Sequence, residues 1–201
     1  MRARPLVCTL LLVAMTPVNA GHGFMNSFGD VEWFPDPGIT PNEWTYRLDR
    51  ADEQLALMRA SGENKFSLPL EYAEEKLSEA SAMIKAKDPA AARIALDYYD
   101  DYITRANVAL ESSSGAEQAA LRSRFIDAVL EHIYLITVDY VDMPLKDRTM
   151  LSKFFETGIL RYEAARDKLP KAARDALFFK EEEVRWSIEM TRQADAQGIV
   201  N

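Results

Sequence analysis

The stretch DPAAARIALDYYDDYITRANVALESSSGAE, residues 88–117, contains the start, the apolar face and the end of one helix. Asp88-Pro89 is a helix start, because proline at the first helical position loses no N–H bond that the helix needs. Apolar and aromatic residues then recur every three or four positions, at Ala92, Ala95, Tyr99, Tyr102, Ala106 and Ala109. This spacing predicts a helix over residues 89–111 with one narrow buried face.

Similar signals divide the rest of the chain. Thr40-Pro41-Asn42-Glu43 and Ser114-Gly115-Ala116-Glu117 are both typical of a capping box at a helix start. Prolines at positions 69, 144 and 170 also stand where a helix can begin. The predicted helical segments are 41–60, 68–86, 89–111, 116–141, 144–168 and 171–197.

The apolar spacing within these segments is helical, and in most of them it forms a narrow seam that suits near-antiparallel packing. In the first segment the seam consists of Trp44, Leu48, Ala51, Leu55 and Met58. No alternating strand pattern bounded by hairpin turns occurs in the sequence. Because the connections are short, we expect an all-α fold, an antiparallel bundle of about six helices. It is either one long bundle or two three-helix units, 41–111 and 116–201, with a boundary at the serines 112–114.

The first twenty residues, MRARPLVCTLLLVAMTPVNA, have the pattern of a secretory signal peptide. Arg2 and Arg4 precede a short apolar run, and Val18-Asn19-Ala20 resembles the A-x-A pattern of a cleavage site, so we expect cleavage after Ala20. Residues 21–40 would then form an extended leading segment of a secreted or periplasmic protein. Cys8, the one cysteine of the chain, would be lost with the signal peptide, and no later apolar run is long enough to span a bilayer.

The charge of the chain restricts its partners. Loss of Arg2 and Arg4 reduces the 24 basic residues to 22, against 32 acidic residues, which leaves a net charge of −10. Such a surface repels nucleic acid and anionic lipid, and a basic protein partner suits it better. An oligomer is also compatible with the sequence.

Residues 34–110 resemble an uncharacterised domain family of secreted helical proteins. The resemblance lies in a Pro-Gly pair followed by a proline and aromatic residues just before a charged helix, here Pro37-Gly38, Pro41, Trp44 and Tyr46. It also lies in a helical hairpin with an Asp-Pro turn, here residues 85–89. The resemblance implies no activity.

Two groups of aromatic and acidic residues are candidates for binding a partner. Tyr98 lies among three aspartates, and tyrosine beside acidic side chains favours a basic partner. The alternative for Tyr98 and the neighbouring Tyr99 and Tyr102 is packing in or beside the core. In and after the leading segment, two tryptophans either dock a partner or close one end of the bundle. The predicted binding residues are Tyr98, Asp97, Asp100, Asp101, Trp33 and Trp44.

Metal binding and catalysis have few candidates. After cleavage at Ala20, the terminus Gly21-His22-Gly23 offers an amine, an amide and the His22 imidazole, nitrogen ligands that Cu(II) prefers. The alternative is a flexible terminus with an incidental histidine. His132 and Asp139 share one face of a predicted helix, either as a catalytic or metal-binding pair or, more plainly, on a solvated face. No phosphate loop, nucleophile elbow or histidine-rich ligand set occurs.

These observations favour an exported, non-enzymatic helical protein, without a cofactor, that acts as a protein-interaction or accessory subunit of the cell envelope. The alternative is a copper-handling protein that uses His22. A third hypothesis is an enzyme with a site around His132 and Asp139.

Overall fold

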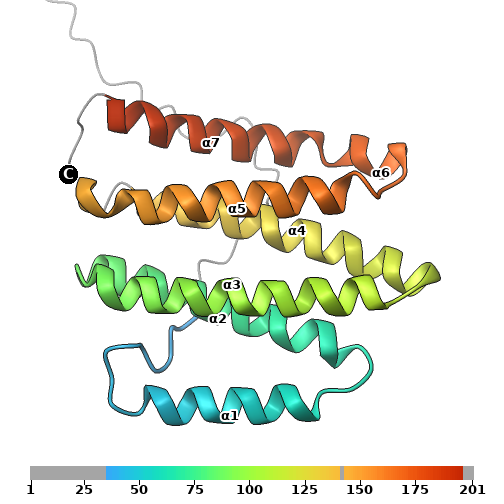
Figure 1. Ribbon diagram of the computed structural model, residues 1–201. Coiled ribbons are helices and arrows are strands. Elements are labelled where there is room, and N and C mark those ends of the chain that lie inside the picture. Colours follow the sequence, from blue (N-terminus) through green and yellow to red (C-terminus); the bar gives the residue numbers. More distant parts are fainter. Residues whose placement is uncertain (1–34, 141–142, 197–201) are drawn as a thin grey trace, which may run out of the picture.

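The structure is a computed structural model that describes residues 35–140 and 143–196 (Figure 1). Helices make up most of this part of the chain, and it contains no strand. The all-α helical bundle predicted from the sequence is therefore confirmed. The helices are α1 (Tyr46–Arg59), α2 (Asn64–Lys85), α3 (Pro89–Ser112), α4 (Gly115–Tyr140), the 3₁₀ turn η1 (Leu145–Asp147), α5 (Arg148–Arg166), α6 (Lys171–Ala176) and α7 (Phe178–Ala196).

The helices stack in layers. Figure 1 shows α1 at one edge, followed by the α2–α3 pair, the α4–α5 pair, and α6 with α7 at the opposite edge. Helix α4 is central, because it packs against α2, α3, α5 and α7. The buried apolar residues of α2 to α5 and of α7 form one continuous cluster. The division of the chain at residues 112–114 stays a prediction.

The predicted buried faces of the middle helices are confirmed. In α3, Tyr99 and Tyr102 are buried together with Ala92, Ala95 and Ala106, and Ala109 is partly buried. The predicted apolar faces of α2, α4 and α5 are buried as well, except for Leu169, which lies past the end of α5 and is partly buried. Their members are Leu70, Ala73, Leu77, Ala80, Ile84, Phe125, Ile126, Val129, Ile133, Ile136, Tyr140, Leu151, Phe155, Gly158, Tyr162 and Ala165.

The turn between α2 and α3 matches its sequence signal. The Asp88 carboxylate accepts the backbone N–H of Ala91 at 3.0 Å, and α3 begins at Pro89 as predicted. On the other side of the turn, Lys87 adopts a left-handed conformation with φ of 60°. The N–H groups of Lys87 and Asp88 donate to the carbonyls of Ile84 and Met83, both at 2.9 Å. These bonds satisfy the last carbonyls of α2 in a Schellman motif.

Several predicted helix bounds are wrong. After Pro144 the 3₁₀ turn η1 comes first, and α5 begins only at Arg148. The Glu43 carboxylate accepts the Thr40 N–H at 2.8 Å, as in a capping box, but this pair closes a turn and α1 begins only at Tyr46. Helix α2 begins at Asn64, so Pro69 lies inside it. The extra turn places Phe66 in the core, and that burial offsets the bond that proline cannot donate. The last predicted segment is divided at Leu177 into α6 and α7.

The seam predicted for the first segment is also wrong, because it faces outward. The exposed fractions are 86% for Trp44, 62% for Leu48, 45% for Leu55 and 81% for Met58. We call these residues and the exposed Ala51 the outer stripe. The buried residues of α1 are instead Tyr46, Arg50 and Glu53. Spacing alone could not distinguish these two faces, because each advances by alternating steps of three and four residues.

Helices α4 and α5 approach closely at Gly158. A Cβ atom built on Gly158 would lie 3.0 Å from both Cγ1 and Cδ1 of Ile133. Glycine therefore permits a helix–helix distance that a larger residue would increase.

We predict that Gly158→Leu lowers the free energy of unfolding by about 1–3 kcal/mol or more, because the added side chain overpacks the α4–α5 contact. Chemical denaturation would measure the change. Glu156→Leu, at an exposed position of the same helix, is the control and should change stability by only about 0.5 kcal/mol. Equal stability of the two variants would contradict the close approach.

Candidate functional site

The inner face of α1 carries charge into the interior of the protein. Tyr46, Arg50 and Glu53 are buried against α2 and α3, and two charged residues of α2, Lys76 and Glu79, are fully buried opposite them. We call these five residues and Tyr102 of α3 the ion cluster. Such a cluster is stable only where each charge has a partner, because the desolvation of an unpaired ion is expensive.

Lys76 is at the centre of the ion cluster. Its ammonium nitrogen lies 2.6 Å from Oε1 of Glu53 and also donates to Oε1 of Glu79. The Tyr46 hydroxyl donates to the other oxygen of Glu79 at 3.1 Å. One lysine of α2 is thus paired with a carboxylate of α1 and with one of its own helix.

Arg50 joins α1 to α3. Its guanidinium carbon lies 3.6 Å from the centre of the Tyr98 ring, a close cation–π contact. One of its nitrogens donates to Glu53 and to the Tyr102 hydroxyl, and that hydroxyl donates to Glu53. The ion cluster therefore links α1, α2 and α3 through charge-assisted hydrogen bonds.

Burial changes the proton affinities of these groups. It raises the pKa of the Glu79 carboxyl from 4.5 to about 7, although the bond from Lys76 acts in the opposite direction. Burial also raises the pKa values of the Tyr46 and Tyr102 hydroxyls, and the neighbouring Glu79 and Glu53 add to the effect. Burial by itself lowers the pKa of Lys76, but the bonds to Glu53 and Glu79 outweigh it, so that the pKa is raised.

Three carboxylates beside Lys76 have the spacing of a metal site. Asp49, Glu53 and Glu75 each place an oxygen within 4.8 Å of the others. The Lys76 ammonium, however, lies 2.6 Å from Glu53 and 3.9 Å from Asp49. The Lys76 ammonium already pairs with two of these three acids, and we assign no metal to the group.

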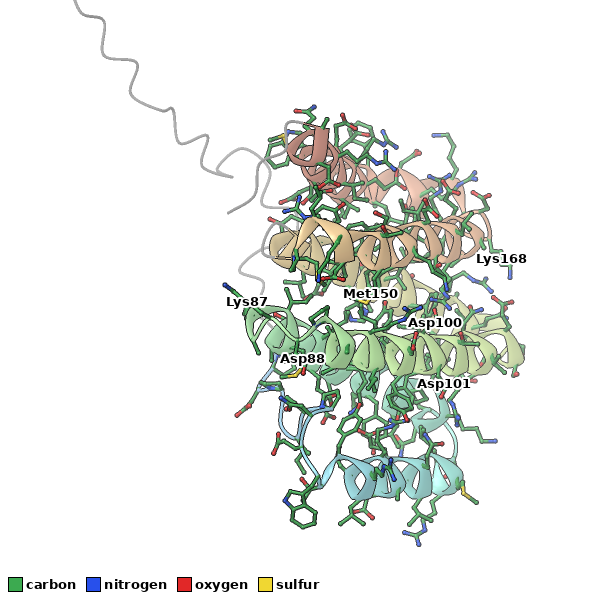
Figure 2. All side chains as sticks on the ribbon, turned by 60° about the vertical axis from the view of Figure 1, so that its left-hand side comes forward. Lys87, Asp88, Asp100, Asp101, Met150 and Lys168 are labelled. Atoms are coloured by element: carbon green, nitrogen blue, oxygen red, sulfur yellow. The ribbon has the colours of Figure 1, made fainter. Side chains whose placement is uncertain are left out.

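A groove runs between α3 and α5 on another side of α3. Its volume is about 680 Å³, and its apolar lining consists mainly of Leu96, Met150 and Phe154. Figure 2 shows Asp100 on the side of α3 that faces α5, with Met150 above it. Arg161 of α5 donates to Asp100 at 2.7 Å and so ties the two walls of the groove together.

The walls of the groove differ in charge. Asp97 and Asp100 are on the α3 wall, while Lys146, Lys153 and Arg161 are on the wall formed by η1 and α5. Each wall also has one charge of the other sign. Arg93 is on the mainly acidic α3 wall, and Asp147 is on the mainly basic wall. Asp97 and Lys153 are exposed, and neither makes an ion pair within residues 35–140 and 143–196.

The predicted binding residues do not form one surface. Asp97 and Asp100 line the groove. Tyr98 is half-buried and points toward α1, where its ring contacts the Arg50 guanidinium. Asp101 pairs with Arg105 of its own helix at 2.9 Å and does not line the groove. Trp44 belongs to the outer stripe.

His22 and Trp33 lie outside the described residues. Copper binding at His22 and docking of a partner at Trp33 therefore stay predictions.

His132 is not on a solvated face, contrary to the plainer of its two predicted roles. It is buried, and its Nδ1 atom lies 3.2 Å from the Tyr99 hydroxyl. Its ring also packs edge-on against the Tyr99 ring. The side chain of Asp139 lies outside the described residues, so the predicted pair stays a prediction.

The ion cluster was not predicted, although the sequence contains a signal for it. Lys76 and Glu79 alternate with the predicted buried residues Ala73, Leu77 and Ala80 of α2. A lysine and a glutamate three residues apart within an apolar face require partners from a neighbouring helix. Arg50 and Glu53 of α1, also three residues apart, have the complementary charges.

A comparison with protein families finds one match, and it covers the part of the chain that contains the ion cluster. Residues 38–134, slightly less than half of the chain, match the family model described as Domain of unknown function (DUF5667). The match agrees with the expected uncharacterised domain and extends through most of α4. No curated protein and no solved structure matches the chain. Among the described residues, no helix has both the length and the apolar character to cross a bilayer.

We predict that Lys76→Met lowers the free energy of unfolding by roughly 3–5 kcal/mol, because it leaves the buried Glu79 without its cation and Glu53 with Arg50 alone. Chemical denaturation would measure the loss. The control is Lys65→Ala at an exposed position of α2, which should change stability by about 0.5 kcal/mol or less. A loss no larger than that of the control would show that Lys76 is not needed to neutralise the cluster.

The raised pKa of Glu79 predicts a specific pH dependence. A carboxyl with a folded pKa of about 7 and an ordinary value of 4.5 binds its proton more tightly in the folded protein. Its contribution to stability is therefore full below pH 4.5 and is lost as the pH rises through 7. We expect the stability of the wild type relative to Glu79→Gln to fall over this interval by on the order of 3 kcal/mol. Urea unfolding of both proteins across this pH range would measure it, and a constant difference would contradict the prediction.

Proposed function

We propose that this protein is an exported, non-enzymatic helical protein that binds a partner protein in the α3–α5 groove. The observation that carries the proposal is the groove itself, which combines an apolar lining with walls of opposite predominant charge. Grooves of this kind between helices accept an amphipathic helix, whose apolar face enters while its polar edges meet the walls.

The charges of the groove suggest the chemistry of the partner. The exposed Asp97 on the α3 wall favours basic side chains along one edge of the partner helix. Lys146 and Lys153 on the opposite wall favour acidic side chains along its other edge. The partner we propose is therefore a helix with one basic and one acidic edge, rather than a uniformly basic protein.

Two further observations support the proposal. The signal-like residues 1–20 support export, and the expected location is the periplasm or the exterior of the cell. The ion cluster supports a structural rather than a catalytic role for its carboxylates, since Lys76 and Arg50 neutralise them and link the helices. The groove is lined instead by surface charges around an apolar floor.

Three synthetic helical peptides with the same apolar face test this proposal. The first has a lysine edge and a glutamate edge, the second has lysine on both edges, and the third has glutamate on both. We predict that the mixed peptide binds several-fold more tightly than the other two, because it alone matches both walls. Fluorescence anisotropy at low and high salt would measure the three affinities, and the preference should weaken as salt screens the charges.

Charge-reversal variants of groove residues give a second test of the same proposal. Asp97→Lys should shift the preference to the all-glutamate peptide, and Lys153→Glu should shift it to the all-lysine peptide. Asp101→Lys is the matched control, because this aspartate is on α3 but outside the groove. If the order of the three peptides is unchanged in both groove variants, the partner does not bind in the groove.

A further inference from the structure

The outer stripe is an apolar helix face that packs against no other helix in the described part of the chain. Its five residues follow steps of four, three, four and three from Trp44 to Met58. This is the heptad spacing by which two helices interlock side chains along a shared seam. Large apolar residues gathered on one exposed face are typical of an interaction site.

We propose that this protein forms a dimer in which the outer stripes of two copies pair as parallel helices. In heptad terms, Leu48 and Leu55 occupy a positions, while Ala51 and Met58 occupy d positions. Trp44 continues the d series just ahead of the helix. Because one two-fold axis relates the copies, each residue of the stripe meets the same stripe on its partner.

The charges beside the stripe favour a second copy and set its direction. Arg47 occupies a g position and Asp52 the e position five residues later, which is the spacing that pairs g of one helix with e of its parallel partner. Both side chains are exposed, and neither makes an ion pair within the described residues. A parallel dimer therefore forms the Arg47–Asp52 pair twice. An antiparallel dimer would instead bring Asp52 near its own copy.

The ion cluster holds α1 in place before a second copy binds. It fixes α1 through its inner face, so the outer stripe is presented on an ordered helix and little conformational entropy is lost on association. Figure 1 shows α1 at the edge of the bundle, with α3 between it and α5. A second copy on the outer stripe would therefore leave the α3–α5 groove free.

The dimer should be weak. A helix of 14 residues is about 21 Å long, which gives an interface at the small end of the range for specific complexes. Sedimentation equilibrium of the purified protein over a wide concentration range should show a reversible monomer–dimer equilibrium. Leu48→Glu and Leu55→Glu should each raise the dissociation constant at least tenfold. Leu160→Glu, at an exposed leucine of α5, should leave it unchanged.

Cysteine cross-linking tests the direction of the pair. In a Cys8→Ser background, the Met58→Cys variant should form an intermolecular disulfide far faster than the Leu160→Cys control, because a parallel pair places residue 58 beside its own copy. In an antiparallel pair, residue 48 of one copy would instead lie beside residue 58 of the other. A disulfide would then form only when the Leu48→Cys and Met58→Cys variants are mixed, and neither variant alone would form one. That outcome would overturn the parallel arrangement.

Charge reversal gives an independent test of the same arrangement. Arg47→Glu and Asp52→Arg should each weaken the dimer, and the double variant should restore it, because the pair forms again with its signs exchanged. A protein that stays monomeric at every concentration would overturn the dimer. If Leu48→Glu and Leu55→Glu leave the dissociation constant of the dimer unchanged, the outer stripe is not the dimer interface. Neither result would alter peptide binding in the groove.

Discussion

The pairing of the Lys76 ammonium with Glu53 and Glu79 determines which side of α1 faces the bundle. A fully buried ammonium and two buried carboxylates would be unstable apart, so each requires the others in place. Glu53 can meet Lys76 only if α1 turns its charged face inward. The same rotation brings Arg50 onto Tyr98 and Tyr102 and carries Leu48 and Leu55 to the outside. Charge neutralisation has therefore outweighed hydrophobic burial in this helix.

How much of the fold could be predicted depended on what holds each helix in place. Helices α2 to α5 are held by apolar burial, and apolar spacing predicted their inner faces, including Tyr99 and Tyr102. Local capping also predicted the start of α3 at Pro89, because Asp88 needs no distant partner to cap it. Helix α1 was predicted with its faces reversed. Apolar spacing assumes that the apolar side faces inward, and the partners that reverse this preference are on α2, far along the chain.

The prediction of binding residues from the sequence had a similar limit. Tyr98 and its three aspartates are adjacent in sequence, and they were predicted to form one binding surface. A helix turns by about 100° per residue, so neighbouring residues point in different directions. Tyr98 consequently packs toward α1, Asp97 and Asp100 line the groove beside α5, and Asp101 pairs along its own helix. The groove itself depends on the distance between α3 and α5, which no local pattern contains.

The attachment of α1 through ions also affects how the native protein fluctuates. The continuous apolar cluster includes α2 to α5 and α7, whereas α1 contributes only the partly buried Leu57 to its margin. Detachment of α1 would return Lys76, Glu53 and Glu79 to water, and their hydration would recover part of the free energy that burial cost. It would leave most of the apolar core closed. The backbone amides of α1 should therefore exchange with solvent through a local opening, well before those of α4, whose exposure requires global unfolding.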